Sequence, residues 1–367
     1  MTAISEAVAA PATGLAARYG ASRLRAGLLI AGALVALVVL AGAVTVRGIN
    51  DTSLATLAAV LAGKLGLGAV LPGAEADPRA AQVLLHLRLP RVVMAMLAGA
   101  ALSVSGVLMQ AITRNPLVSP YTIGVSSAAS FGASVAIMFG FGWTGAGVYL
   151  VPLSAFGFAL LAALAVFGVT WWRGMGAQAM ILTGIALMYL FSAMTAAVQF
   201  IATEEQLARV VHWTFGSLNG VRWEAVGVCA LMLAVALPMM QMRAWHLNVL
   251  TVAGDEVART LGVNVTALRG MAIVLAVISA ATVISFAGVI GFVGLIGPHL
   301  ARMLIGGDHR TLIPFAAITG AMLLLVADTV GRLAFTPIVI PVGIVVAFVG
   351  VPLFLHLILA RQRENFS

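Results

Sequence analysis

The sequence predicts an all-α polytopic membrane protein, and three observations predict this fold class. Hydrophobic residues make up 62% of the 367 residues and charged residues only 9%, whereas roughly 25% of the residues in soluble domains are charged. The apolar residues fall in runs of about 20, the length that a helix needs to cross a bilayer. The basic residues gather at the ends of these runs, as is usual at membrane surfaces. No soluble fold of this size could bury so much apolar surface.

Ten apolar segments are long enough to be membrane-spanning helices. A polar, alanine-rich extension, residues 1–25, precedes the first segment. The apolar run that follows is longer than the core of about 7–15 residues in a cleaved signal, so we expect it to be retained. The chain then forms a single transmembrane domain, residues 26–360, with a cytoplasmic tail at residues 361–367. The expected spans are residues 26–46, 92–112, 121–140, 147–170, 179–201, 225–242, 269–287, 289–305, 312–331 and 340–360.

The basic residues predict which side of the membrane each loop faces. With ten spans, twelve of the 20 lysines and arginines fall on the side of the N-terminus and eight on the other side. Because cytoplasmic loops carry an excess of Lys and Arg, both termini are expected in the cytoplasm. The bias is modest, so the outer side carries more arginine than topology requires. Topology also explains the net charge of +8 without a nucleic-acid partner.

Two loops are predicted to contain short helices outside the membrane. The outer loop, residues 203–224, contains three glutamates and two tryptophans, and Trp favours the headgroup level of a membrane. The inner loop, residues 243–269, contains a mildly amphipathic stretch of about two helical turns between Gly254 and Gly262. A soluble partner could contact this inner stretch.

Small residues on two spans predict close helix packing. Glycine inside a helix costs roughly 0.5–1 kcal/mol relative to alanine. A glycine at every third position therefore needs a reason, and in a membrane the usual reason is the close approach of two backbones. Pro298 then bends the chain that follows. The predicted packing residues are Gly99, Ser103, Gly106, Gly288, Gly291, Gly294, Gly297 and Pro298.

Four charged residues are expected near the outer ends of the second and ninth spans. Arg88 and Arg91 lie three residues apart, and Asp328 and Arg332 lie four apart. An unpaired carboxylate within a membrane is costly, so we expect Asp328 to pair with Arg332, and a proton relay is the alternative. Arg88 and Arg91 either anchor their helix at the interface or contact a partner.

The sequence contains no motif for catalysis, nucleotide binding or a resident metal. It has no GxxxxGK[ST] phosphate loop and no HExxH pair, and its six histidines are scattered. Its one cysteine, Cys229, lies in an apolar run, which excludes a disulfide framework and a thiolate metal site. If ATP drives this protein, another subunit must bind it.

Several short motifs follow one another over nearly the whole chain after residue 80. They are RLPR at Arg88–Arg91, SGVLMQ at Ser105–Gln110, RNPL at Arg114–Leu117, GVSS at Gly124–Ser127, GDEVARTLGV at Gly254–Val263, GFVGLIGPHLAR at Gly291–Arg302, DHR at Asp308–Arg310, ADTVGR at Ala327–Arg332 and IPVGI at Ile340–Ile344. In this order they resemble the FecCD-type permeases, which are membrane subunits of ABC importers for iron–siderophore complexes, heme and cobalamin.

The resemblance implies a cobalamin-importer-like permease fold in the bacterial inner membrane. It implies a homodimer with the substrate path on its axis. The implied partners are a second copy of the chain, two ABC ATPase subunits and a periplasmic substrate-binding protein. ATP and magnesium would be bound by the ATPase subunits, and this chain would bind no cofactor.

The resemblance also implies roles for individual residues. Arg88, Arg91 and Arg332 match arginines that face glutamates on the binding protein. Residues 243–269 match the segment that couples to the ATPase, and the turn before the fifth span would lie near the cytoplasmic gate. The implied coupling residues are Gly254, Asp255, Glu256, Ala258, Arg259, Leu261 and Gly262, and the implied gate or path residues are Gly176, Ala177 and Gln178. The turn lacks the Ser/Thr of cobalamin permeases.

The implied function is the import of an iron chelate, a siderophore complex or heme, by alternating access. A cobalamin importer is the alternative within the family. An ion-coupled secondary transporter would need acidic residues or broken helices at the membrane midplane, and only Asp328 could serve. A membrane-embedded enzyme would need a catalytic cluster, and the sequence shows none.

Overall fold

The computed structural model describes residues 12–47, 53–64, 77–139, 147–172, 176–334 and 336–364, and every regular element in these residues is helical. Residues 1–11 of the expected extension and residues 365–367 of the expected tail lie outside the described part. The elements in order are α2 (Ala12–Val46), α3 (Leu54–Lys64), α4 (Pro78–Val83), the π-helical turn η2 (Leu84–Arg88), α5 (Leu89–Thr113), the 3-10 turn η3 (Pro120–Ile123), α6 (Val125–Met138), α7 (Gly147–Trp172), α8 (Ala177–Ile201), α9 (Glu204–Thr214), α10 (Trp223–Met242), α11 (Ala244–Thr260), α12 (Val265–Ala287), α13 (Val293–Ile305), α14 (His309–Leu333) and α15 (Val342–Glu364).

The ten expected spans correspond to ten of these helices, which confirms the predicted fold class. They are α2, α5, α6, α7, α8, α10, α12, α13, α14 and α15. Seven helices in the described part are long and apolar enough to cross a bilayer. The helices α6 and α13 are shorter, with 14 and 13 residues, because a turn precedes each of them.

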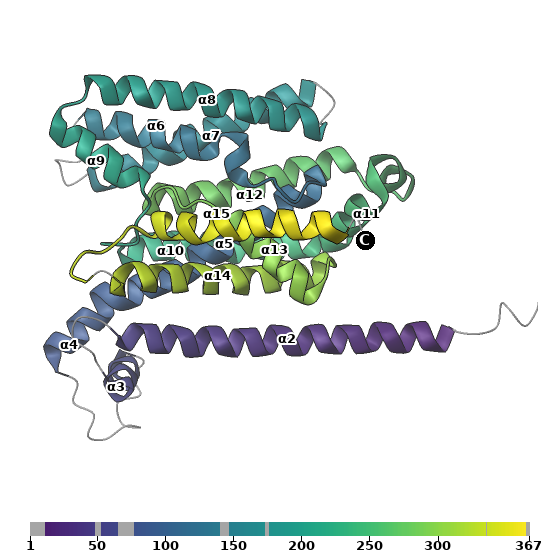
Figure 1. The fold of residues 1–367 in the computed structure, drawn as a ribbon, viewed down its shortest axis with the longest axis horizontal. Coiled ribbons are helices and arrows are strands. Elements are labelled where there is room, and N and C mark those ends of the chain that lie inside the picture. Colours follow the sequence, from purple (N-terminus) through teal and green to yellow (C-terminus); the bar gives the residue numbers. More distant parts are fainter. Residues whose placement is uncertain are drawn as a thin grey trace, which may run out of the picture.

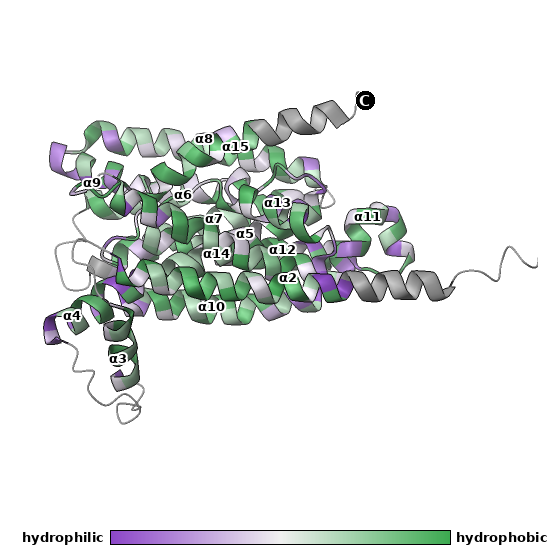
Figure 2. Ribbon diagram, turned by 60° about the horizontal axis from the view of Figure 1, so that its bottom comes forward, coloured by the Kyte–Doolittle hydropathy of each residue, from purple (hydrophilic) through white to green (hydrophobic). Residues whose placement is uncertain are grey.

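The helices form one bundle with polar ends. In Figure 1, α3, α4 and α9 lie at one end of the bundle and α11 lies at the other. We call these the outer end and the inner end. Figure 2 shows hydrophobic residues along the middle of the bundle and hydrophilic residues towards its two ends. The predicted helices of the two loops are α9 and α11, and α9 begins with a capping box between Thr203 and Gln206.

Helix α5 lies at the centre of the bundle, packed against α10, α12, α13 and α14. Its residues from Ala98 to Thr113 are all buried. Small residues explain how four neighbours fit around it, because they let backbones approach closely. A Cβ atom on Gly99 would overlap the carbonyl of Gly320 in α14, and one on Gly106 would overlap the carbonyl of Gly294 in α13.

The glycine series before Pro298 is only partly helical, which corrects the expected packing. Gly288 ends α12 with φ +70°, and Gly291 lies in the turn between α12 and α13. Apart from its chain neighbours, no atom of the described residues lies within 4 Å of the position of a Cβ on Gly291, so Gly291 makes no close packing contact within this part of the chain. Gly294 and Gly297 lie in α13, where Gly297 faces Ser103 of α5.

Candidate functional sites at the two ends of the bundle

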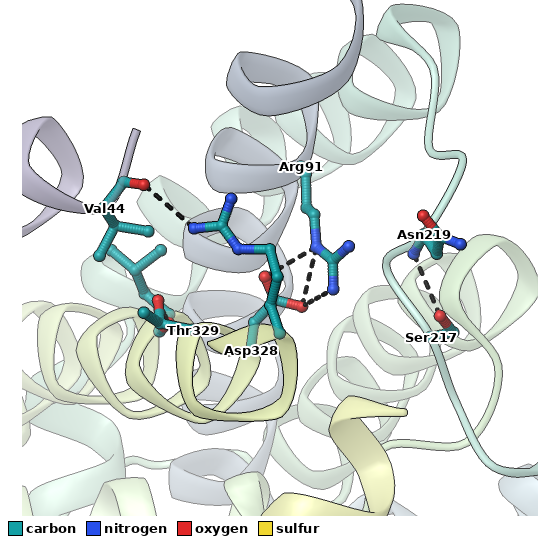
Figure 3. A network of polar contacts seen from close by, with 8 residues as sticks. Val44, Arg91, Ser217, Asn219, Asp328 and Thr329 are labelled. Carbon is teal, nitrogen blue, oxygen red and sulfur yellow. Dashed lines mark hydrogen bonds and ion pairs between the residues drawn. The ribbon is translucent and has the colours of Figure 1, made fainter. Parts of the chain in front are cut away.

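A buried ion pair joins α5 to α14 at the outer end (Figure 3). Arg91 Nε lies 2.9 Å from Asp328 Oδ2, and Arg91 Nη2 lies 2.8 Å from Asp328 Oδ1. Asp328 is 2% exposed and Arg91 is 12% exposed. The predicted pairing of Asp328 with Arg332 is therefore wrong. The guanidinium of Arg91 arrives from another helix and presents two N–H groups that match the carboxylate.

Arg88 and Arg332 instead bind the last carbonyls of α2. Arg88 Nη1 donates to the carbonyl oxygens of Thr45 at 3.2 Å and Val46 at 3.0 Å. Arg332 Nη2 donates to that of Val44 at 3.1 Å, as Figure 3 shows. The last carbonyls of a helix have no partner within the helix, and they carry partial negative charge. Two guanidinium groups therefore cap α2 from outside.

This capping matters because α2 packs loosely elsewhere. Only 17% of its most apolar stretch is buried. Its outer end also meets α3 and the turn η2, where Leu57, Val60 and Leu84 form a small apolar cluster. Sequence reasoning missed the capping because Arg332 lies 288 residues from Val44.

A hollow of about 1190 Å³ opens at the outer end beside this network. Five arginines and two carboxylates lie among the residues that line it, so its charge is positive. Arg79 and Arg222 are exposed, whereas Arg88 is buried and Arg91 and Arg332 are half-buried. The charged lining residues are Asp77, Arg79, Arg88, Arg91, Arg222, Glu224 and Arg332. Arg79 and Arg222 were not predicted, and the excess of outer arginine was the signal that could have found them.

At the inner end, Gly254 divides α11 into two arms. Its φ of +82° and ψ of 179° are not helical, and glycine adopts such a backbone without steric strain. We call residues 244–253 the first arm and residues 255–260 the second arm. Gly262, with φ +84°, follows the second arm. The two glycines bracket a short helical stretch, as the sequence predicted.

The second arm has an exposed face and an attached face. Glu256 and Arg259 of the second arm are exposed, and so are Leu261 and Gly262 directly after it. We count all four in the exposed face. On the attached face, Ala258 is fully buried, and the half-buried Asp255 forms an ion pair with Arg269 of α12. The predicted coupling residues therefore divide between these two faces.

Three apolar side chains are exposed on and beside α11. Val252 is 88% exposed, Val257 48% and Leu261 57%. They lie at the polar end of the bundle rather than in its apolar middle (Figure 2). Apolar side chains exposed on a polar surface can serve a protein–protein contact.

The first arm is attached to the start of α14. Asn248 Nδ2 donates to Asp308 Oδ1 at 2.7 Å, and the backbone N–H of His309 donates to Asn248 Oδ1 at 2.8 Å. Asp308 also caps α14 through the backbone N–H of Arg310. The DHR motif is therefore a junction between α11 and α14.

The predicted gate residues lie at the start of α8. Gly176 is its N-cap, Ala177 is half-buried and Gln178 is exposed. The sequence of α8 contains no charged residue and no histidine. Exposed groups such as Leu182, Ile185 and Tyr189 recur along one face of this helix. Among the described residues, no group of three His, Cys, Asp or Glu side chains is placed to hold a metal ion.

Fold and sites together define a polytopic helical membrane protein with a cationic outer end and a partly apolar inner end. A profile of the FecCD transport family matches residues 34–360. The chain belongs to this family and is the permease of an ABC importer.

Three curated relatives illustrate the range of the family. The chain is 43% identical over 290 residues to ABC transporter permease protein MJ0087 of Methanocaldococcus jannaschii, covering 77% of this chain and 83% of that protein. It is 36% identical over 294 residues to the molybdate import permease MolB of Haemophilus influenzae, covering 80% and 86%. It is also 36% identical over 284 residues to the hemin transport permease HmuU of Yersinia pestis, covering 77% and 84%.

A solved structure matches the fold as well. It is described as an inward-facing conformation of a metal-chelate type ABC transporter. The TM-score is 0.79 at 34% sequence identity, and the match covers 91% of this chain and 99% of that chain.

Proposed function

We propose that this permease forms the membrane path for an iron chelate, a siderophore complex or heme, which moves from periplasm to cytoplasm by alternating access. ATP and magnesium are bound in separate subunits, and ATP is hydrolysed there. The observation that carries this proposal is the pairing of a cationic hollow at the outer end with exposed apolar side chains at the inner end. Each end suits a different soluble partner.

The inner end would bind the ATPase. Val257 and Leu261 of the exposed face would enter an apolar groove, and Glu256 and Arg259 would add charged contacts at its rim. Interfaces of this kind have an apolar centre and a polar rim. We propose two copies of this chain with two ATPase subunits, in the inner membrane of a bacterium, with both termini in the cytoplasm.

The outer end would receive a periplasmic substrate-binding protein whose surface carries carboxylates. The hollow contains five arginines against two acids, which makes a positive potential that can steer an acidic partner. Arg79 and Arg222 are exposed enough for direct contact. Arg88, Arg91 and Arg332 contribute charge to the hollow while their hydrogen bonds hold α2, α5 and α14 together.

The uncharged helix α8 supports a chelate as cargo. We propose that α8 lines the path, because its start carries the predicted gate residues Gly176, Ala177 and Gln178. A path without charged groups offers no counter-charge to a small oxyanion. An iron ion enclosed by an organic ligand needs less counter-charge, since the ligand covers the metal. This reasoning favours hemin or a siderophore complex over molybdate.

Reconstitution in vesicles tests the proposal. The permease would be inserted together with its cognate ATPase and binding protein, and uptake would be measured for hemin, a ferric siderophore, cobalamin and molybdate. We expect uptake of an iron chelate that requires hydrolysable ATP and the binding protein. ATP-dependent uptake of cobalamin or molybdate alone would refute the proposed cargo. Uptake driven by an ion gradient without the ATPase would refute the proposed mechanism.

A further inference from the structure

An ion pair fastens the second arm of α11 to the membrane-spanning helix α12. Arg269 Nη1 lies 2.7 Å from Asp255 Oδ2, and Arg269 Nη2 lies 2.9 Å from Asp255 Oδ1. The two parallel bonds form the bidentate arrangement that fixes both distance and orientation. The side chain of Arg269 is 7% exposed and that of Asp255 is 29% exposed.

Arg269 also reaches a third element, the central helix α5. Its Nε donates to the carbonyl oxygen of Ile112 at 3.1 Å. Ile112 lies in the last turn of α5, where backbone carbonyls have no partner within the helix. One guanidinium group therefore holds together the second arm, α12 and the inner end of α5. A lysine could not make these three contacts at once, because its ammonium group lacks the planar fork.

The backbone around Gly254 keeps the second arm next to α5. A Cβ on Gly254 would lie 2.8 Å from Nη1 of Arg114, the residue that ends α5. The start of the second arm therefore lies beside the guanidinium of Arg114 at the end of α5. The first arm has its own attachment to α14 through Asn248. The two arms of α11 are therefore attached to different helices on either side of Gly254.

Helix α5 continues from this junction to the outer end. There Arg91 pairs with Asp328 of α14. A hydrogen bond from Arg269 ties α5 to α12 at the inner end, and the buried ion pair of Arg91 and Asp328 ties α5 to α14 at the outer end. A displacement of the second arm would therefore act directly on a helix that runs between the two ends of the bundle.

We propose that Arg269 is the positioning residue through which ATP-driven movement of the second arm reaches α5 and α12. The inference rests on the proposed function, because it requires an ATPase that acts on α11. Asp255 lies on the attached face of the second arm, where it meets Arg269 of α12, and Glu256 lies on the exposed face. The two faces consequently have separable tasks: the exposed face holds the ATPase, and the attached face transmits its movement.

Two substitutions in the ion pair of Asp255 and Arg269 and one on the exposed face of the second arm test this assignment in the complete reconstituted complex. Asp255→Asn removes the charge of the pair with little change in size, and Arg269→Lys keeps the positive charge but loses the fork. Glu256→Gln alters the neighbouring carboxylate on the other face. For each complex we would measure retention of the ATPase on the purified permease, ATP hydrolysis, and chelate import. The unaltered complex is measured first. If that complex does not import the chelate, the proposed function is refuted and the role of Arg269 is not the cause.

For Asp255→Asn and Arg269→Lys, we expect the ATPase to be retained and ATP hydrolysis to continue. Chelate import should fall about tenfold, within the range of coupling free energies between linked sites. The number of ATP molecules hydrolysed per imported chelate should rise accordingly. Asp255→Glu, which preserves the carboxylate, should recover part of the import. Glu256→Gln should instead change ATPase retention while leaving that ratio unaltered.

Two results would overturn the inference while the unaltered complex works. One is normal import by both Asp255→Asn and Arg269→Lys, which would show that movement reaches the path by another route. The other is a parallel loss of ATPase retention, hydrolysis and import, which would assign Arg269 to folding or docking alone.

Discussion

Arg91 of α5 donates three hydrogen bonds to the carboxylate of Asp328 in α14, although the two residues lie 237 positions apart. The pair lies where two helices with small residues approach closely, since Gly99 and Gly320 meet about two turns further in. Apolar contact and an ion pair therefore stabilise the same helix pair. This arrangement makes the outer end of the bundle rigid beneath the hollow.

We expect Asp328→Asn to destabilise the protein strongly, because it leaves the guanidinium of Arg91 buried without its counter-charge. Breaking a buried pair in this way costs about 3–5 kcal/mol. The measurement is the midpoint of thermal unfolding in detergent micelles. Glu205→Gln is the matched control, since it breaks the exposed pair of Glu205 and Arg209, for which we expect about 0–1 kcal/mol. Equal shifts in the two variants would contradict the prediction.

We expect Gly106→Ala to separate α5 from α13, because the new methyl group would overlap the carbonyl of Gly294. Overpacking of this kind typically costs about 1–3 kcal/mol. Gly157→Ala in α7 is the control, since nothing lies within 4 Å of its Cβ position. Alanine there should be neutral or stabilise the helix by up to about 1 kcal/mol. Unfolding midpoints of both variants test the comparison.

The same distances distinguish two glycines before Pro298. Leucine at Gly294 should abolish uptake while membrane insertion persists, because the Cβ alone would lie 3.1 Å from the carbonyl oxygen of Leu102. Leucine at Gly291 should be tolerated, since that position is open. Uptake in reconstituted vesicles and the amount of inserted protein are the two measurements. Loss of uptake in both variants would indicate a role for Gly291 other than packing.

We expect the double substitution of Arg79 and Arg222 by glutamate to weaken association with the loaded binding protein, mainly by slowing the association rate. The effect should be largest at low ionic strength, where charges are less screened. Arg209→Glu is the control, because Arg209 is also an exposed outer arginine but does not line the hollow. Association rates would be measured by surface plasmon resonance at two salt concentrations. An equal effect of Arg209→Glu would mean that net charge, rather than the hollow, controls docking.

Arg88→Ala and Arg332→Ala should loosen the outer end of α2 by removing its caps. A cysteine at Thr45, which is 2% exposed, would report this as faster labelling by a maleimide. The native Cys229 is fully buried, so it should contribute little background. A cysteine at Ser53, which is already exposed, should label at the same rate in all backgrounds. Unchanged labelling at Thr45 would show that the caps are dispensable.

The helices could be predicted from the sequence because each span is a local property of about 20 consecutive residues. The short helical stretch at the end of α11 could also be predicted, because Gly254 and Gly262 lie on either side of a short amphipathic sequence. The turn at residues 288–292 could not be predicted, since no charge or proline marks where α12 ends. Its glycines therefore suggested one continuous packing surface.

The charged network could not be predicted in detail because it joins elements far apart in the chain. Spacing alone made Arg332 the nearest partner for Asp328, whereas the fold brings Arg91 to that carboxylate. The partner of Arg269 was equally hidden, although Asp255 lies only 14 residues away. A return of the chain through a turn places them together, and local periodicity does not encode that geometry.

The turn η2 determines in which direction α4 points. A π-helical turn contains one residue more than the α-helical turn that would replace it. Deleting one residue between Leu84 and Arg88 would therefore rotate α4 about the axis of α5 by about 100°. Arg79 would leave the rim of the hollow, while Arg88 and Arg91 would keep their places. The direction of α4, and with it the position of Arg79, thus depends on the one extra residue of η2.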